Sequence, residues 1–481
     1  MTKIMSPLDA DHQITPYFHI SLNLNQKISN TSMDKQLIRK YNVPGPRYTS
    51  FPPVPEWNPK PPTIQDWKNS IRETFNATNQ KEGISLYIHL PFCESLCTYC
   101  GCNTRITVNH KVEKPYIDSV LKEWQLYLDT FRDKPKVAQI HLGGGTPTFF
   151  SPENLQYLMD SIHQTIDLLP NAELGFEGHP NNTSKSHLAT LHSLGFTRLS
   201  LGIQDFDYSV QKKVNRIQSY ETVSDVVFNA RKAGYYSINF DLIYGLPLQT
   251  PQTIEATIKK VSTLKPNRIA FYSYAHVPWT KPGQRGFVEN DLPSNEAKRE
   301  LYELGKQMLE DLEYKEIGMD HFSLTSDDLY LAANTGTLHR NFMGYTPRKT
   351  SLLIGLGSSS IGDSWTAYAQ NVKVVELYQK LVHEGKLPIF KGHQLSAREQ
   401  SMRHHILDLM CNYNTQLDPG FTKKLTKNAQ KQLETLVDDG LINLVENRLE
   451  VLPKGKPFVR NICMAIDPFC KKEKSVYSKT I

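Results

Sequence analysis

An alternation of short β-rich runs with longer amphipathic runs is the feature that most constrains the fold of this chain. It begins near residue 84 and gives six predicted strands, with runs of helical periodicity between them. This order is typical of parallel strands joined by right-handed crossovers. The predicted strands are Ser85–His89, Val137–Leu142, Glu173–Glu177, Arg198–Ile203, Ile238–Ile243 and Arg268–Ser273. The predicted helices include Pro115–Thr130, Glu153–Ile166, Lys185–Leu194, Ser219–Ala233 and Pro251–Leu264.

Six βα units are fewer than a closed barrel of this kind contains. The pattern therefore leaves two architectures open, a partial, open βα barrel and a doubly wound sheet. In both, ligands bind at the carboxyl ends of the strands. Polar residues follow the predicted strands there: Cys93, Gly143 to Thr146, Glu177, Gln204 with Asp205, Asp241, and Ser273 to His276. This series predicts a single functional site at the mouth of the α/β domain.

Four cysteines lie close together in the loop after the first predicted strand. Cys93, Cys97 and Cys100 have the spacing C-x3-C-x2-C, and Cys102 follows. Three thiolates can hold three irons of a [4Fe–4S] cluster and leave the fourth iron open to a small molecule. A structural zinc site closed by Cys102 or His89 is an alternative, and so is a disulfide. Disulfides are disfavoured, because the seven cysteines are an odd number and the chain is long enough to form a core.

Other motifs at the strand ends have both a functional and an ordinary interpretation. The run Gly143-Gly144-Gly145-Thr146 lets backbone approach a ligand closely, or it is only a tight turn, and it lacks the spacing of a phosphate loop. Glu177 and Asp241 are suited to ribose hydroxyls, or they cap helices. Arg216 is suited to a ligand carboxylate, although a single arginine on a helix is more often solvated.

Charge and hydropathy exclude several classes of protein. The net charge of +6 is mild, and no block of like charges forms a nucleic-acid arm. No run is long and apolar enough to span a membrane, and the N-terminus lacks the apolar segment of a secretory signal. We therefore expect a cytoplasmic protein without a membrane span, in a reducing compartment where thiolate ligands persist.

Composition divides the chain into five expected parts. Residues 1–35 are polar and are predicted to be a flexible extension, and residues 36–83 are predicted to contain a helix and a proline-rich, extended surface arm. Residues 84–290 hold the βα units, and residues 291–394 are expected to be a helical connection that closes over a cofactor. Residues 395–481 are predicted to form helices followed by two short strands.

The last part resembles a winged helix, with the wing turning at Glu446-Asn447. Such a domain could bind DNA. The helix before the wing, Thr426–Asp438, offsets its lysines with Glu434 and Asp438, however, so it lacks a basic stripe. A structural or substrate-covering role is favoured, and no nucleic-acid partner is expected.

The cysteine spacing resembles that of the radical S-adenosylmethionine (SAM) superfamily, whose core is a six-stranded partial βα barrel. Further stretches are similar to one family within it, the oxygen-independent coproporphyrinogen III oxidases, also called coproporphyrinogen III dehydrogenases. The stretches that carry this resemblance are 46–50, 87–93, 99–103, 143–148, 201–206, 241–247, 274–276, 318–322, 339–346 and 460–464. They run from the arm almost to the C-terminus.

The resemblance implies a role for individual residues. Cys93, Cys97 and Cys100 would bind the [4Fe–4S] cluster, and Cys102 would stay free. One SAM would be contacted from Tyr87, Gly144, Glu177 and Ile361. A second SAM would be contacted from Tyr99, Gly145, Thr146, Gln204, Arg216, Asp241 and Ala275.

The family's reaction gives the expected substrate and partners. A 5′-deoxyadenosyl radical would abstract hydrogen from each of two propionate side chains of coproporphyrinogen III in turn. Each side chain would then lose CO2 and one electron and become a vinyl group of protoporphyrinogen IX in haem biosynthesis. An electron donor, unidentified from the sequence, would be needed, and a monomer is expected. The four carboxylates of the substrate call for arginines in the cavity, with Arg47 and Arg340 as candidates.

The chain departs from the family pattern in one place. The third strand is followed by His179 and Asn181, where the family usually has an acidic residue and an arginine. This change is expected to alter the fit of the substrate. Competing functions are a haem chaperone of the same superfamily, an anaerobic haem-modifying methyltransferase, and a non-enzymatic zinc and winged-helix protein.

Overall fold

The computed structural model describes residues 35–58, 62–470 and 477–480. They belong to two units, one that ends at Asn42 and one that begins at Val43, and each is described by itself. The first unit contains α2 (Lys35–Tyr41), in agreement with the helix expected between residues 36 and 83. The flexible extension expected over residues 1–35 lies, apart from Lys35, outside the described residues.

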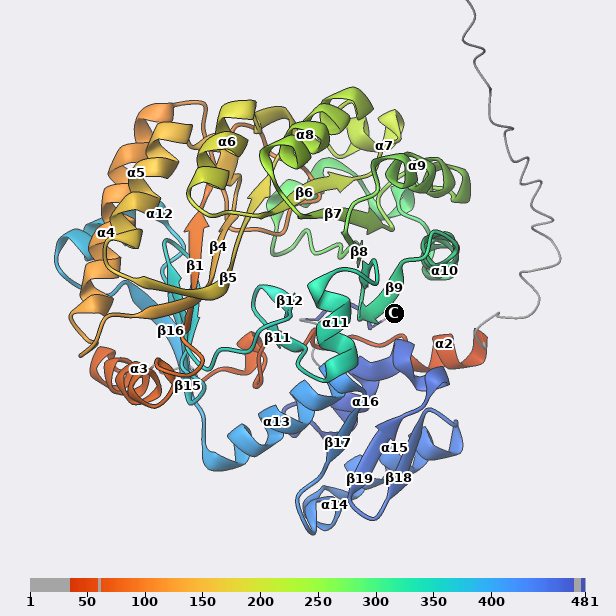
Figure 1. Cartoon of the computed structure of the whole chain (residues 1–481). Coiled ribbons are helices and arrows are strands. Elements are labelled where there is room, and N and C mark those ends of the chain that lie inside the picture. The colour runs from red at the N-terminus through yellow and green to blue at the C-terminus, as the bar shows by residue number, and fades with distance from the viewer. Residues whose placement is uncertain (1–34, 59–61, 471–476, 481) are drawn as a thin grey trace, which may run out of the picture. The chain divides into compact units, whose positions relative to one another are not determined.

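A twelve-stranded sheet forms the centre of the second unit, with the order β16-β15-β14-β13-β1-β4-β5-β6-β7-β8-β10-β9 (Figure 1). The six predicted strands are confirmed as its parallel part. They are β1 (Ile84–Leu90), β4 (Lys136–Gly144), β5 (Asp167–Gly178), β6 (Arg198–Gln204), β7 (Ser237–Tyr244) and β8 (Arg268–Ser273). These six follow one another in chain order, without the reversal that defines a doubly wound sheet. The predicted open, partial βα barrel is therefore confirmed.

The connecting helices cover the outer face of the parallel strands (Figure 1). They are α4 (Glu113–Leu128), α5 (Pro152–His163), α6 (Lys185–Ser193), α7 (Tyr208–Lys213), α8 (Tyr220–Ala233) and α9 (Pro251–Leu264). Their starts follow from sequence, because Ser151, Ser219 and Thr250 each accept a hydrogen bond from a backbone N–H of the first turn.

The core lies between these helices and the sheet. In α8, Val223, Val226, Val227 and Ala230 are buried, which is the spacing of one helical face. In β1 and its neighbours, alternate apolar side chains such as Ile140 point to the same layer and are fully buried. Burial of a large aliphatic side chain stabilises the fold by about 1.5–3 kcal/mol.

The expectation of a helical connection over residues 291–394 is wrong. The segment begins with α10 (Asn295–Asp311) and also holds α11 (Asp328–Thr335) and α12 (Val375–His383), but most of its elements are strands. These are β9 (Lys315–Gly318), β10 (His321–Ser323), β11 (His339–Asn341), β12 (Gly344–Thr346), β13 (Leu353–Leu356), β14 (Ile361–Asp363), β15 (Ala367–Asn371) and β16 (Ile389–Gln394).

Six of these short strands extend the central sheet at its two edges, while β11 and β12 pair with each other in a separate sheet. β13 pairs parallel to β1, β14 to β16 continue antiparallel, and β10 pairs antiparallel to β8. Strands of three to six residues give little periodicity in the sequence, and their partners are far away along the chain. That is why a reading of local pattern missed them.

The C-terminal part has the expected helices and wing. It contains α13 (Ala397–Asn412), α14 (Phe421–Lys424), α15 (Lys427–Asp438) and α16 (Val459–Ile466). A small sheet of order β17-β19-β18 accompanies them, with β17 (Asn414–Gln416), β18 (Ile442–Val445) and β19 (Arg448–Val451). The turn between β18 and β19 falls at Glu446 and Asn447, as predicted.

The proline-rich arm is extended but buried, not spread on the surface as expected. The Arg460 side chain donates hydrogen bonds to the carbonyls of Gly45 and Pro46. The hydroxyl of Tyr48, which is 2% exposed, donates to Asp467. The arm is followed by α3 (Ile64–Thr78). The domain boundaries expected from the sequence stay predictions. Within the described residues, no helix has the length and apolar character needed to cross a bilayer.

Candidate functional site

Two strands of the barrel show why a cavity forms beside them. In β6, Leu199, Leu201 and Ile203 are buried, and the residues that alternate with them, Ser200, Gly202 and Gln204, line a cavity. β7 has the same alternation and contributes Asn239, Asp241 and Ile243. Parallel strands are usually apolar on both faces. A polar inner face therefore marks a place built to hold something polar.

The cysteine loop forms one wall of this cavity, which has a volume of about 730 Å³. Two short strands, β2 (Phe92–Cys93) and β3 (Arg105–Ile106), pair and close the base of the loop. The N–H of Cys100 donates to the Cys97 carbonyl at 3.0 Å, which brings these two cysteines round one turn.

Each thiol of the loop has a polar neighbour. The Cys93 Sγ is 3.3 Å from the Thr146 Oγ1, and the Arg216 Nη1 donates to the Cys97 Sγ at 3.5 Å. The pKa of Cys100 is lowered, chiefly because its sulfur accepts a hydrogen bond from the Cys102 thiol. The pKa of Cys93 is raised to about 11 by burial. All four thiols are free of disulfides.

In the described part of the chain, no three His, Cys, Asp or Glu side chains lie close enough together to hold a single metal ion. The thiolates of a [4Fe–4S] cluster bind separate irons, so this arrangement does not bear on such a cluster. The donor set itself, three free thiols in one loop with a guanidinium beside one of them, fits a thiolate-bound cluster.

The glycine turn at the end of β4 lies directly against the base of the cysteine loop. The N–H of Gly145 donates to the Leu90 carbonyl at 2.8 Å. A Cβ on Gly145 would lie 2.5 Å from the Pro91 carbonyl oxygen, and one on Gly144 would lie 2.6 Å from the His89 ring. Gly144 also has a φ of +116°. Only glycine fits here, so the turn is an element of close packing that leaves backbone facing the cavity.

Glu177 and Asp241 are carboxylates whose pKa values are shifted in opposite directions by their surroundings. Burial alone would raise the pKa of Glu177, but the His141 imidazole and the N–H of Gly144 hold that pKa below its usual value. The Asp241 pKa is raised to about 6, first by burial and then by the charge of Glu177. Asp241 accepts hydrogen bonds from Ser200 and Asn239. Both carboxylates line the cavity.

Gln204 and Arg216 meet at a break in the sheet. The pairing of β6 with β7 shifts register between Gly202 and Gln204, and Gln204 has a φ of +67°. The Arg216 Nη2 donates to the Gly202 carbonyl at 2.5 Å, while its Nε is buried and has no partner in the described residues. The Arg216 guanidinium is therefore held in place, and its Nε–H is left as a donor for a ligand.

The structure brings most of the predicted site residues together. Eleven line the one cavity: Cys93, Cys97, Cys100, Tyr99, Gly144, Gly145, Thr146, Glu177, Gln204, Arg216 and Asp241. Tyr87, Ala275 and Ile361 are not among the lining residues. The Tyr87 ring stacks on His141, the Ala275 carbonyl accepts from Gln284, and Ile361 packs on the cluster around Trp57 and Tyr368.

The cavity also includes residues that sequence reasoning missed. His141, Tyr272, His321 and Tyr345 line it, as do two arginines, Arg198 and Arg268. Most of them lie within strands, on the inner face, rather than at strand ends. The alternation of polar with apolar residues along β6 and β7 was the signal that could have found this deeper wall.

The two residues that depart from the family pattern also lie in the wall. The His179 pKa is lowered to about 3, first by burial and then by the charge of Arg216, so the imidazole is neutral. Its Nδ1 accepts from the N–H of Asn181. The Asn181 Nδ2 in turn donates to the Ile217 carbonyl.

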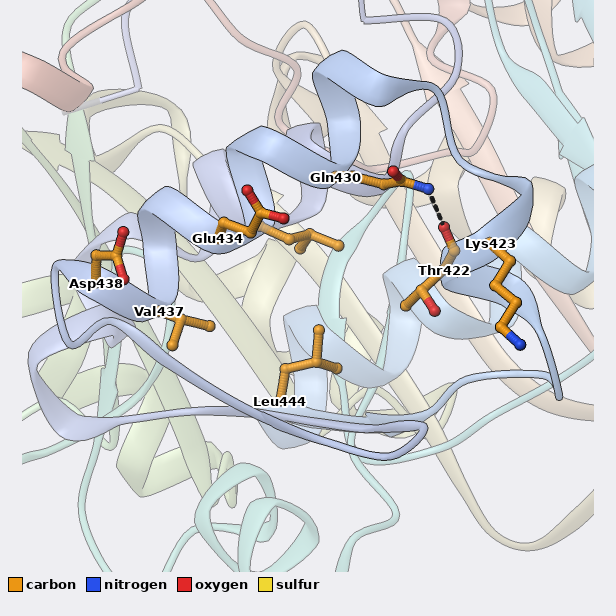
Figure 2. A pocket seen from close by; sticks show the side chains of 8 residues that line it. Thr422, Lys423, Gln430, Glu434, Val437, Asp438 and Leu444 are labelled. Atoms are coloured by element: carbon orange, nitrogen blue, oxygen red, sulfur yellow. Dashed lines mark hydrogen bonds between the residues drawn. The ribbon is translucent and has the colours of Figure 1, made fainter.

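A second cavity, of about 390 Å³, lies in the C-terminal part between α14, α15 and β18 (Figure 2). Glu434 and Asp438 lie along α15, and Lys423 projects from α14. The Gln430 side chain donates to the Thr422 carbonyl at 2.9 Å. The lining holds no cysteine or histidine, so the larger cavity is the candidate active site.

Comparisons with known proteins agree with this geometry. A family model described as the radical SAM superfamily matches residues 87–261, from β1 to α9. The protein called oxygen-independent coproporphyrinogen III oxidase in Helicobacter pylori is 38% identical over 461 residues, which cover 94% of this chain and all of that one. Its namesake in Escherichia coli is 35% identical over 453 residues, 93% of this chain and 97% of that one.

A solved structure, described as coproporphyrinogen III oxidase (HemN) from Escherichia coli and as a radical SAM enzyme, superposes with a TM-score of 0.84. It is 33% identical, and the match covers 91% of this chain and 99% of that one. The fold and the comparisons together define a radical SAM enzyme. Within that class, the chain belongs to the family of oxygen-independent coproporphyrinogen III oxidases. The resemblance seen in the sequence is thereby confirmed.

Proposed function

We propose that this enzyme carries out the oxygen-independent oxidative decarboxylation of two propionate side chains of coproporphyrinogen III, giving the vinyl groups of protoporphyrinogen IX. The observation that carries the proposal is that the thiol loop, the glycine turn and the carboxylates of Glu177 and Asp241 all line one cavity. Relatives that match more than nine tenths of the chain bear the name of this activity. The proposed place of the reaction is haem biosynthesis.

Radical SAM enzymes use a [4Fe–4S] cluster and SAM. We assign the cluster to Cys93, Cys97 and Cys100, because these three thiols share one loop whose base is closed by β2 and β3. Cys102, which contacts Cys100, is assigned as the free thiol. When bound, the cluster and SAM supply the one-electron chemistry that attacks the propionate. The protein's own part is to hold the reactants in place and to exclude water.

One SAM would contact Tyr87, Gly144, Glu177 and Ile361, and a second would contact Tyr99, Gly145, Thr146, Gln204, Arg216, Asp241 and Ala275. What supports two molecules is the presence of two carboxylates on different strands, Glu177 on β5 and Asp241 on β7, each able to accept from ribose hydroxyls. The spare Nε of Arg216 is a donor for a ligand carboxylate.

Three further points belong to the proposal. The reaction requires an electron donor that reaches the cysteine loop. A monomer is proposed on the family resemblance alone. The cytoplasm is the proposed location, since free thiols persist in a reducing compartment.

The test is anaerobic reconstitution with iron and sulfide, followed by SAM, a reductant and coproporphyrinogen III. We expect 5′-deoxyadenosine and a product with two vinyl groups to accumulate together. Haem binding without turnover would assign the chain to the haem chaperones instead. Methyl transfer from SAM to the tetrapyrrole would indicate the haem-modifying alternative.

A further inference from the structure

Part of the cavity wall consists of aromatic rings with positive charge beside them. Tyr272, His321 and Tyr345 line the cavity there. The Arg47 guanidinium lies over the Tyr272 ring, 5.7 Å from its centre, and the Arg340 guanidinium lies over the Tyr345 ring at 4.5 Å. Both arginines are thus one ring away from the cavity.

Two more cations join them, and we call Arg47, Lys298, Arg340 and Arg460 the basic cluster. Burial lowers the pKa of Lys298 to about 8; Asp320 opposes this effect, whereas Arg47 and Arg460 add to it. The pKa of Arg460 is lowered to about 9, first by burial and then by Arg47. The Arg340 Nη2 donates to the Arg47 carbonyl, and the Arg460 side chain donates to the carbonyls of Gly45 and Pro46, so Arg340 and Arg460 both lie beside the backbone around Arg47.

The charges in the basic cluster are poorly balanced. Asp320 pairs with Arg47, the Nη2 and Oδ2 atoms being 2.5 Å apart. The Lys298 Nζ and the Arg460 Nε donate to backbone carbonyls rather than to carboxylates. Carbonyl oxygens satisfy hydrogen bonds without neutralising charge, so the cluster keeps an excess of positive charge.

Arg340 is the least satisfied member. It is 4% exposed, and its Nη2 donates to the Arg47 carbonyl at 3.3 Å. Its Nε and Nη1 are buried and have no hydrogen-bond partner within the described residues. A buried cation without an anion lowers the stability of a fold. Such an arrangement is retained where an anion completes it.

We propose that Arg47 and Arg340 form a carboxylate-binding site that holds a propionate of the tetrapyrrole at the part of the cavity lined by Tyr272 and Tyr345. Arg47, whose side chain is 32% exposed, would meet the carboxylate beside the Tyr272 ring, and Arg340 adds positive charge and further donors nearby. The inference rests on the proposed function for the identity of the ligand. It deepens that function by naming the residues that select a polycarboxylate.

The experiment measures ligand binding rather than turnover. The reconstituted protein is titrated with coproporphyrin III, followed by its fluorescence, and separately with the tetraamide of coproporphyrin III, which has the same ring and no negative charge. The original protein should bind the tetracarboxylate about tenfold or more tightly than the amide. Arg47→Gln and Arg340→Met should lose most of that difference, with little change for the amide.

Arg403→Met is the matched control. Arg403 is also 4% exposed and also lies over aromatic rings, but it is paired with Asp363. Its loss should lower the unfolding temperature and leave the preference for the tetracarboxylate intact. Arg340→Met should instead not lower the unfolding temperature of the ligand-free protein, and we expect it to raise that temperature by about 2 °C or more, because it removes an unpaired buried charge.

The proposal is overturned if Arg47→Gln and Arg340→Met keep the preference for the tetracarboxylate, or if they weaken both ligands equally. Its failure is distinguishable from failure of the proposed function. A protein that binds coproporphyrin III through Arg340 but forms no vinyl product would retain the carboxylate site and lose the assigned reaction. If both variants form the vinyl product and bind coproporphyrin III as tightly as the original protein does, the assigned reaction stands and the carboxylate site is ruled out.

Discussion

The parallel strands and the strands added at the edge beside β1 are built on different physical principles. β1 and β4 to β8 pair in chain order, and β4 to β8 present a largely polar inner face to the cavity. The flanking strands β13 to β15 present no residue to that cavity. They are joined to the rest of the molecule by buried polar contacts, among them Arg403 with Asp363 and Glu123 with Asn371.

This difference indicates a division of labour. The parallel strands and their loops carry the residues proposed for chemistry, so changes there should abolish activity and leave the fold largely intact. The flank buries charged groups that take no part in the proposed reaction, so changes there should alter stability and leave the reaction intact. Ile361, on β14, is the exception, since the family resemblance assigns it a contact with SAM.

The largest effect is expected in the cysteine loop of the parallel half. Cys97→Ser should remove one of three thiolate ligands, because serine is a poor ligand for iron. Iron and sulfide content after reconstitution should fall sharply, and vinyl product should fall to background. Cys102→Ser is the control and should retain the iron content of the original protein. A cluster that survives Cys97→Ser but is lost in Cys102→Ser would overturn the ligand assignment.

The glycine turn should be the next most sensitive place. In Gly145→Ala the new methyl group would lie 2.5 Å from the Pro91 carbonyl, so backbone has to move. A displacement of this kind beside reacting groups costs about a hundredfold in rate. Product formation measured at saturating SAM should show that loss. Gly175→Ala, on β5, meets its nearest neighbour at an ordinary 3.4 Å and should change the rate by less than about twofold. Equal rates for both variants would contradict the close-packing argument.

The flank should respond in stability instead. Arg403→Met leaves the buried Asp363 carboxylate without its cation, and breaking such a pair costs about 3–5 kcal/mol. Denaturant unfolding monitored by circular dichroism should show this loss. Turnover of the folded fraction should match the original protein well below the unfolding transition. A variant with normal stability but impaired turnover would show that the flank takes part in the chemistry.

The same two regions differ in how far sequence predicts them. The parallel strands were predictable because strand, helix and cap signals recur locally, as at Ser219 before α8. The cysteine, glycine and carboxylate positions followed from the rule that ligands bind at the ends of parallel strands. The flank was not predictable in this way. β14 has three residues, and its partner β13 contacts β1 from far along the chain, so no local period marks it.

The deeper wall of the site was missed for a related reason. His141 and Tyr272 lie inside strands, whereas the rule that predicted the site applies only to the ends of strands. The partners of buried charged side chains are equally hard to predict from the sequence. Nothing in the order of residues says that Arg340 lacks a carboxylate partner while Arg403 has one, because both facts depend on which distant strands and helices come together.

The smallest effect is expected at Glu123, whose buried carboxylate on α4 holds the start of the flank. It accepts from the N–H of Gly357 at 2.8 Å, the Tyr378 hydroxyl at 2.7 Å and the Asn371 amide at 2.6 Å. Burial nevertheless raises its pKa from 4.5 to about 7. The folded state therefore binds this proton more tightly than the unfolded state does.

The sign of the pH dependence follows. Below pH 4.5 Glu123 is protonated in both the folded and the unfolded state and does not lower the stability of the fold. As the pH rises from 4.5 to about 7, the free energy of unfolding should fall by a total of about 3 kcal/mol. Glu123→Gln has no such proton and should lack this slope. At low pH it should be the less stable protein, because its amide N–H2 faces the donor of Asn371. Denaturant unfolding at pH 5 and pH 8 gives the difference between the two proteins. Parallel curves would mean that Glu123 stays ionised throughout, held by its three donors.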